Sequence, residues 1–416
     1  MKKLFIVGIA ALLLVVFTVP AMAKVKMGGI IFTDFYYLDR NAQSAAANGL
    51  GSDPYQVTAI QVPNITRLYG RWTNEDNVGM FIELGIGQTG GAVDNSSSSG
   101  VALRHAYGWW DVTPSFQIMA GKSTTPFSPL NPSQMLGTRS GSLNIIGVGY
   151  GNFYSGRFAQ VRGTFKFGKV GRVALAIVDP NGSQRFHATY NNYFPYDRWT
   201  GPPFNATYQT NTKLPRFDLA VPLYFGPVSL YPGFLFQQRT VDANTSNYDN
   251  SVNTYIGSLG VKAGFGGFSI SAEGNYGQNW ANTRGLIGTS GPSFLASAQL
   301  NPVSGEINNS TTYSFWVDLS YKIGPVTPHV MYGQEDSKVD GYFEYNPATW
   351  NHPTGQYNMV STSRMWGFSI PIDLAKGFRV RPELMWYYDG EIQARGTDIE
   401  QLGSYAIYGV QFQITF

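Results

Sequence analysis

The stretch YSFWVDLSYKIGP, residues 313–325, decides the fold class. Large apolar or aromatic side chains take every second position from Tyr313 to Ile323, and polar side chains lie at most positions between them. A period of two places successive side chains on opposite faces of a β-strand. The final Gly-Pro pair then predicts a tight turn into a second strand. We therefore expect an antiparallel hairpin with one apolar and one polar face.

The same alternation recurs along the chain from residue 24 onward. Val78, Met80 and Ile82 begin another apolar row, and Glu83 lies on the opposite face. No convincing helical stripe interrupts these patterns. The alternation predicts sixteen strands, at residues 24–39, 64–73, 78–87, 101–112, 116–122, 157–167, 172–179, 215–225, 227–239, 253–265, 267–281, 310–323, 326–336, 361–373, 378–391 and 404–416.

The connections between these strands alternate in length. The short ones are residues 74–77, 113–115, 168–171, 226, 266, 324–325 and 374–377. The long ones are residues 40–63, 88–100, 123–156, 180–214, 240–252, 282–309, 337–360 and 392–403. Short periplasmic turns at one end and long extracellular loops at the other are typical of bacterial outer-membrane barrels. A soluble β-sandwich has no reason to sort its connections in this way.

The two faces of the strands indicate which side meets lipid. Sixteen strands enclose an interior too wide for side chains to fill, so a polar inner face must hold water. The continuous apolar face must then point outward into lipid. Closure of the barrel also removes the unpaired strand edges that lipid would not tolerate. The sequence therefore predicts an all-β chain that forms a transmembrane antiparallel β-barrel. No second apolar run of about twenty residues predicts a membrane-spanning helix.

The first residues have the three parts of a secretory signal peptide. Lys2 and Lys3 are followed by the apolar run Leu4–Val19, and Ala21-Met22-Ala23 offers small residues at a cleavage site. We expect cleavage after Ala23, which gives a signal peptide at 1–23 and a single outer-membrane β-barrel domain at 24–416. The alternative is a retained membrane helix, for which the run is short.

The composition excludes several classes of function. Cysteine is absent, which excludes thiolate metal sites, CxxCH haem attachment and thiol nucleophiles. Only 13% of residues are charged, whereas 15% are aromatic, as expected of a barrel with aromatic girdles. Removal of Lys2 and Lys3 from the 29 basic residues leaves 27 against 26 acidic ones, and this near-neutral balance argues against a nucleic-acid partner.

The last predicted strand, Tyr405 to Phe416, has apolar residues at every second place and ends in an aromatic residue. This resembles the C-terminal signature that the barrel-assembly machinery reads in outer-membrane proteins. With sixteen strands and a long third loop, the mature chain resembles the trimeric porin superfamily. The segment Ala120–Phe127 is similar to the entry into the constriction loop of such porins. The resemblance implies a homotrimer in outer-membrane lipid and lipopolysaccharide.

The third long connection, residues 123–156, is the predicted constriction loop. Its apolar content, which includes Leu143, Ile145 and Phe153, indicates that it packs against something. We expect it to fold into the pore against the inner wall, as the resemblance implies. A surface loop at a trimer interface is the alternative.

Basic residues dominate the predicted constriction. No Asp or Glu occurs from Val112 through Val178, where Lys122, Arg139 and Arg162 are found among other basic residues. Porins of this kind usually carry acids on the third loop, so this sequence departs from the family. The predicted pore-lining residues are Arg67, Arg71, Glu83, Arg104, Lys122, Arg139, Arg162, Arg379, Arg381 and Glu383. Basic side chains around a pore favour anions, so we expect a mild anion preference. The alternative is that these arginines merely pair with acids of the wall.

Three functions remain open at this stage. The first is a porin for passive diffusion of small hydrophilic solutes. The second is a channel selective for small anions, and the third is a structural or scaffold barrel without transport. Four histidines are scattered, and no catalytic, metal-binding or cofactor-binding motif is found, so we expect neither an enzyme nor a cofactor.

Overall fold

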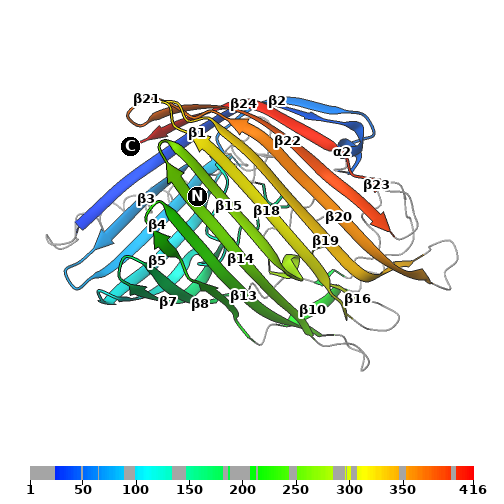
Figure 1. Ribbon diagram of the computed structural model, residues 1–416, viewed down its shortest axis with the longest axis horizontal. Helices are drawn as coiled ribbons and strands as arrows, with labels where there is room; N and C mark the ends of the chain where they lie inside the picture. Colours follow the sequence, from blue (N-terminus) through cyan, green and yellow to red (C-terminus); the bar gives the residue numbers. More distant parts are fainter. Residues whose placement is uncertain are drawn as a thin grey trace, which may run out of the picture.

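The computed structural model describes residues 24–47, 50–63, 65–88, 99–133, 147–180, 186–187, 207–211, 214–242, 251–283, 296, 298–300, 307–345, 353–394 and 400–416. These residues form a closed antiparallel barrel of sixteen strands with almost no helix, which confirms the predicted fold class. Figure 1 shows the strands running obliquely side by side around the barrel. Among the described residues, no helix is long and apolar enough to cross a membrane. The expected signal peptide lies outside the described residues.

The barrel strands follow one another in chain order, each hydrogen-bonded to the next. Their bounds are β1 (Lys24–Arg40), β3 (Arg67–Thr73), β4 (Val78–Gln88), β5 (Ser99–Thr113), β6 (Phe116–Thr124), β7 (Arg157–Phe167), β8 (Gly171–Val178), β11 (Arg216–Ala220) continued by β12 (Leu223–Phe225), β13 (Val228–Asp242), β14 (Ser251–Phe265), β15 (Phe268–Gln278), β18 (Ser310–Tyr321), β19 (His329–Tyr345), β20 (Pro353–Ser369), β22 (Phe378–Ala394) and β24 (Ser404–Thr415).

The first and last strands close the barrel. One edge of β1 pairs with β24 from Ile30↔Thr415 to Arg40↔Tyr405. The other edge pairs with β3 near its start and with β2 (Tyr55–Gln61) near its end. Figure 1 shows the blue β1 and the red β24 side by side. The sheet therefore has no free edge along β1, as a barrel in lipid requires.

Short helices and strands lie at the long-loop end of the barrel. They are α2 (Ala42–Ala47), β9 (Phe186–His187), β10 (Thr207–Asn211), the 3-10 helix η1 (Trp280–Asn282), β16 (Gln299–Leu300), β17 (Ile307–Asn308) and β23 (Glu400–Gln401). At the opposite end, β21 (Ile372–Ala375) continues β20 toward the turn into β22. The tight turns at this end include Gly168 and Gly226, which have φ near +60° and so favour glycine.

The two faces of the sheet differ as the alternation predicts. On β18, Tyr313 and Phe315 are 50% and 42% exposed, whereas Ser314 between them is 3% exposed. The exposed rows of the other strands are likewise apolar or aromatic, for example Leu175 and Leu259. The apolar face therefore points away from the barrel axis, which is the arrangement that lipid requires.

One expected loop is mostly strand. We expected residues 337–360 to form a loop, but β19 extends to Tyr345 and β20 begins at Pro353, and the two strands pair through this region. In the β19 part of this segment, Ser337, Lys338 and Asp340 interrupt the alternation of apolar residues. A strand that extends beyond lipid loses its apolar row but keeps its backbone hydrogen bonds, so alternation of apolar residues does not detect it.

Candidate functional site in the barrel lumen

The connection between β6 and β7 lies inside the barrel on the inner wall. Ser128 Oγ donates a hydrogen bond to Glu273 Oε1 on β15 at 2.5 Å, and the Leu130 amide donates to Glu273 Oε2 at 3.4 Å. The Ser133 amide donates to Asp318 Oδ2 on β18 at 3.0 Å. Both carboxylates are on the sheet face opposite the exposed apolar rows. These described residues of the third loop therefore contact the inner wall.

The returning arm of the third loop follows the same wall. The Tyr150 hydroxyl donates to Asp389 Oδ1 on β22 at 2.6 Å, and Ser314 Oγ donates to the Gly151 carbonyl oxygen at 2.8 Å. Gly151 has a φ of 114°, and a Cβ there would lie 2.3 Å from the Phe315 carbonyl oxygen. Glycine is therefore what allows the loop backbone to touch the wall.

Apolar side chains complete this packing. Leu130 and Tyr150 are buried with wall residues that include Trp316, Met331, Met365, Met385 and Ile407. Phe127 and Phe153 meet edge to face, with ring centroids 5.3 Å apart, and are buried with Leu235, Ile256 and Trp280. Each fully buried side chain of this size contributes roughly 1.5–3 kcal/mol. Buried apolar contacts thus hold the loop against the wall.

The half of the inner wall between β11 and β22 carries acids that are buried. Asp218, Glu273, Asp318, Glu383 and Asp389 are each at most 4% exposed. Each of them has a partner that donates a hydrogen bond. The donors include Arg216 to Asp218 at 2.6 Å and Ser369 to Glu383 at 2.7 Å, in addition to the loop contacts above. The hydrogen bonds of these carboxylates are therefore made to side chains of the wall or to the loop that packs on it.

The other half, formed by β3 to β7, carries arginines that share one carboxylate. Arg104 Nε lies 2.7 Å from Glu83 Oε1, and Arg67 Nε lies 3.6 Å from Glu83 Oε2. Arg157 does not bind this carboxylate: its Nε donates to His105 Nε2 at 3.0 Å and its Nη1 to the Tyr154 hydroxyl at 2.7 Å. Three guanidinium groups therefore surround a single buried acid, which leaves a local excess of positive charge.

Two more arginines extend this basic surface toward the short-turn end. Arg71 is exposed and lies over the Trp109 ring, 4.6 Å from its centroid. Arg162 is half-buried, and its Nε has no hydrogen-bond partner in the described part of the structure. The register places both arginines on the inner face, since Arg71 pairs with Phe81 and Arg162 with Met119.

Lys122 is a correction to the sequence prediction. We expected it in the pore, but it pairs with Ala106 on β5 and with Ala159 on β7. Ala159 is exposed on the outer face, between the inward Phe158 and Gln160. Directly opposed residues of paired strands share a face, so Lys122 lies on the outer face. Our prediction relied on the charge pattern of the segment and did not apply alternation to this residue.

The remaining predicted residues are distributed along the wall. Arg381 and Glu383 are buried on β22, and Arg381 Nη1 donates to Gln411 at 3.4 Å. Arg379 is bound to Asp373 at 2.6 Å, close to the short-turn end and away from the third loop. Arg139 lies outside the described residues. The fold brings two groups of predicted residues into contact: Arg67 and Arg104 with Glu83, and Arg381 with Glu383 at 3.9 Å.

Sequence reasoning missed the residues that hold the loop. Ser128, Tyr150 and Asp389 carry no motif, and their pairing joins positions more than a hundred residues apart. Arg157 was left out of the predicted pore-lining residues. It pairs with the exposed Thr124 on β6 and so has the parity of the outer face, yet its guanidinium reaches His105.

The fold brings one serine and histidine together. Ser123 Oγ lies 3.4 Å from His105 Nδ1. The other ring nitrogen accepts from Arg157 rather than contacting a carboxylate, and Glu83 is bound to arginines. A guanidinium in this place opposes the imidazolium that a hydrolytic triad must form. Among the described residues, no group of histidines and acids could hold a metal ion.

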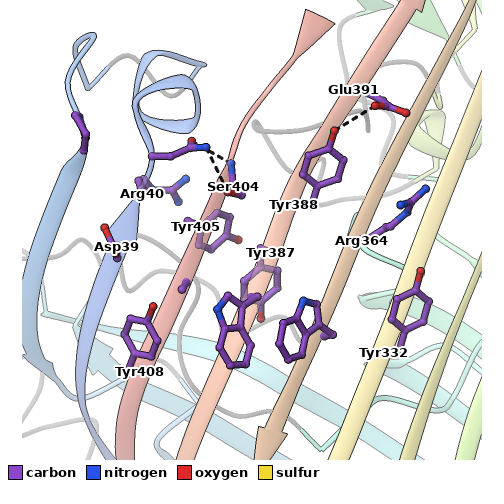
Figure 2. Close-up of a pocket in the computed structure, with 15 residues that line it drawn as sticks. Asp39, Arg40, Tyr332, Arg364, Tyr387, Tyr388, Glu391, Ser404, Tyr405 and Tyr408 are labelled. Atoms are coloured by element: carbon purple, nitrogen blue, oxygen red, sulfur yellow. Dashed lines mark hydrogen bonds between the residues drawn. The ribbon is translucent and has the colours of Figure 1, made fainter. Parts of the chain in front are cut away.

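A separate hollow of about 600 Å³ lies near the long-loop end, on β1, β19, β20, β22 and β24. Its Trp366 and Trp386 rings stack with centroids 3.9 Å apart, on the outer row of the sheet. Figure 2 shows Arg364 beside this row and the hydrogen bond from Tyr388 to Glu391. These outward side chains do not belong to the lumen wall.

Comparison with known proteins finds the same fold in solved structures of outer-membrane channels. No protein-family model and no curated protein matches the sequence. Solved structures do match. The outer membrane channel DcaP of Acinetobacter baumannii is 14% identical with a TM-score of 0.62, and the match covers 96% of this chain and 99% of that one.

Two further structures match over similar lengths. The anion-selective porin from Comamonas acidovorans is 13% identical with a TM-score of 0.57, over 95% of this chain and 100% of that one. OmpF of Salmonella typhi is 10% identical with a TM-score of 0.52, over 94% and 98%. The chain therefore has the fold of the sixteen-stranded outer-membrane porins.

Proposed function

We propose that this chain is a porin of the bacterial outer membrane, through which small hydrophilic solutes diffuse passively, with a preference for anions. The closed barrel with its apolar outer face supports a membrane location. Two structures with the same fold, an outer membrane channel and an anion-selective porin, support transport. The expected signal peptide at 1–23 supports export.

The observation that carries the anion preference is the uneven covering of the inner wall. The third loop packs on the half that holds Glu273, Asp318 and Asp389, and each of these acids has a bound partner. The arginines of β3 to β7 lie on the other half, where Arg67 and Arg104 share Glu83. A pore with a net positive wall raises the local concentration of anions and lowers that of cations.

We also propose a homotrimer. One matching structure, OmpT of Vibrio cholerae, is described as a trimer form, with a TM-score of 0.52. Outer-membrane lipid and lipopolysaccharide are the expected surroundings of the apolar face. Cross-linking of the protein in detergent, read by mass, tests the oligomer independently of transport.

The test of function is the reversal potential of single channels in planar bilayers under a KCl gradient. A steady conductance with a reversal potential on the chloride side supports the proposal. Cation selectivity contradicts the charge argument and leaves a porin. A folded barrel that conducts nothing contradicts the porin and favours the structural barrel.

A further inference from the structure

Aromatic rings form a continuous row on the basic half of the lumen wall. Tyr69, Phe81, His105, Tyr107 and Trp109, here called the aromatic ladder, lie on the inner faces of β3, β4 and β5. Adjacent ring centroids are 5.5–6.2 Å apart, from Tyr69–Phe81 through Phe81–Tyr107 to Tyr107–Trp109. His105 joins the ladder at 5.8 Å from Phe81. These spacings allow edge and tilted contacts between neighbouring rings.

The ladder is accessible from the lumen along most of its length. Tyr69, Phe81, His105 and Tyr107 are half-buried, and Trp109 is 8% exposed. On the covered half of the wall the aromatic rings are buried instead, for example Tyr387 at 0% and Trp316 at 1%. The third loop packs on those rings through Leu130 and Tyr150, whereas four of the ladder rings keep part of their surface exposed.

Arginines border the ladder on both sides. Arg67, Arg104 and Arg157 lie around Glu83 and His105, at the end of the ladder farther from the short turns. Arg71 lies over Trp109, and Arg162 is on β7, which β6 separates from β5. A solute in contact with the rings is therefore within reach of several guanidinium groups, which bind carboxylates through paired hydrogen bonds.

We propose that the aromatic ladder and its bordering arginines form a binding site in the lumen for small anions that carry a planar aromatic group, such as aromatic carboxylates. The rings of the ladder stack against the apolar ring of the solute, and the arginines bind its carboxylate. This inference rests on the proposed function and narrows the anions that the pore favours. Selection of anions by charge alone would not require four accessible aromatic rings beside the arginines.

The test compares benzoate with cyclohexanecarboxylate as blockers of the chloride current through single channels, at a pH where both are ionised. The two anions have the same charge and similar size, and only benzoate is planar and aromatic. Contacts between aromatic rings give a preference of about three- to tenfold. We expect benzoate to block at concentrations lower by that factor. Equal block by the two anions in an anion-selective channel would overturn the inference and leave the proposed function intact.

Substitutions test separately how the aromatic rings and the arginines contribute to block by the two anions. Phe81→Leu should bring the benzoate preference close to one, and Phe81→Tyr should restore it. Phe315→Leu makes the same change on the outer face, where Phe315 is 42% exposed, and should leave the preference unchanged. Arg71→Gln should weaken block by both anions equally. A preference that survives in Phe81→Leu would contradict a role for the ladder, and a wild-type channel without anion selectivity would refute the proposed function first.

Discussion

The two halves of the inner wall differ in how their charged side chains are partnered: the third loop packs on the half whose acids are buried and bound, whereas arginines outnumber their one shared acid around Glu83 on the other half. Asp318 and Asp389 on the covered half are bound by the loop and buried. On the other half Arg71 is exposed and Arg162 is half-buried, and neither forms an ion pair among the described residues. The count of acidic and basic residues, which is nearly balanced, therefore says little about the pore. The charge that a solute meets depends on which side chains the loop leaves accessible.

Charge reversal on the β3 to β7 half of the wall should have the largest effect on ion selectivity. The double variant Arg71→Glu and Arg162→Glu replaces two accessible cations with anions and breaks no buried ion pair. We expect the chloride-to-potassium permeability ratio to fall by at least about tenfold, because the local concentration of each ion follows the potential of the wall. Reversal potentials in planar bilayers measure the ratio.

Lys122→Glu provides the control for charge. It changes the net charge as each of those single substitutions does, but on the outer face. We expect its permeability ratio to match that of the wild type. A shift in Lys122→Glu as large as in the arginine variants would contradict the inner and outer assignment of these residues.

Release of the loop from the covered half should produce the next largest effect. Glu273→Ala removes the acceptor for Ser128 and for the Leu130 amide. Buried donors left without partners cost about 1–3 kcal/mol each, so the loop should loosen. We expect noisier open-channel currents and a larger mean conductance, recorded from single channels. Glu391→Ala removes a carboxylate outside the lumen and should change neither quantity; equal effects would show that Glu273 does not hold the loop.

The sequence predicted the barrel more completely than the pore. Alternation such as that from Tyr313 to Ile323 reports the outer face directly, because lipid imposes the same requirement on every strand. The lumen has no such common requirement. The pairing of Tyr150 with Asp389 depends on how a long loop folds back across the barrel. Arg157 has the parity of the outer face, yet its guanidinium donates to His105 in the lumen. Such contacts follow from tertiary structure rather than from local spacing.

A backbone substitution tests the contact between loop and wall without changing charge. Gly151→Ala introduces a Cβ that would lie 2.3 Å from the Phe315 carbonyl oxygen, at a φ of 114°. Gly168→Ala also has a positive φ, but nothing lies within 4 Å of its Cβ. We expect Gly168→Ala to lower the free energy of unfolding by about 1 kcal/mol and Gly151→Ala by about 1–3 kcal/mol more. Urea titration of the refolded barrel gives both values, and equal losses would mean that the loop does not press on the wall at Gly151.

The smallest effect is expected at an exposed ion pair that lies away from the third loop and from the arginines around Glu83. Arg379 and Asp373 lie 2.6 Å apart at the short-turn end, with side chains 35% and 52% exposed. Water screens such a pair, and exposed pairs contribute about 0–1 kcal/mol. Asp373→Asn should therefore change the free energy of unfolding by no more than about 0.5 kcal/mol, measured by the same titration, and should leave the permeability ratio within error. A clear gain in chloride selectivity would show that carboxylates at the short-turn end also act on the ions in the pore, and that the charge of the lumen is not set by the β3 to β7 wall alone.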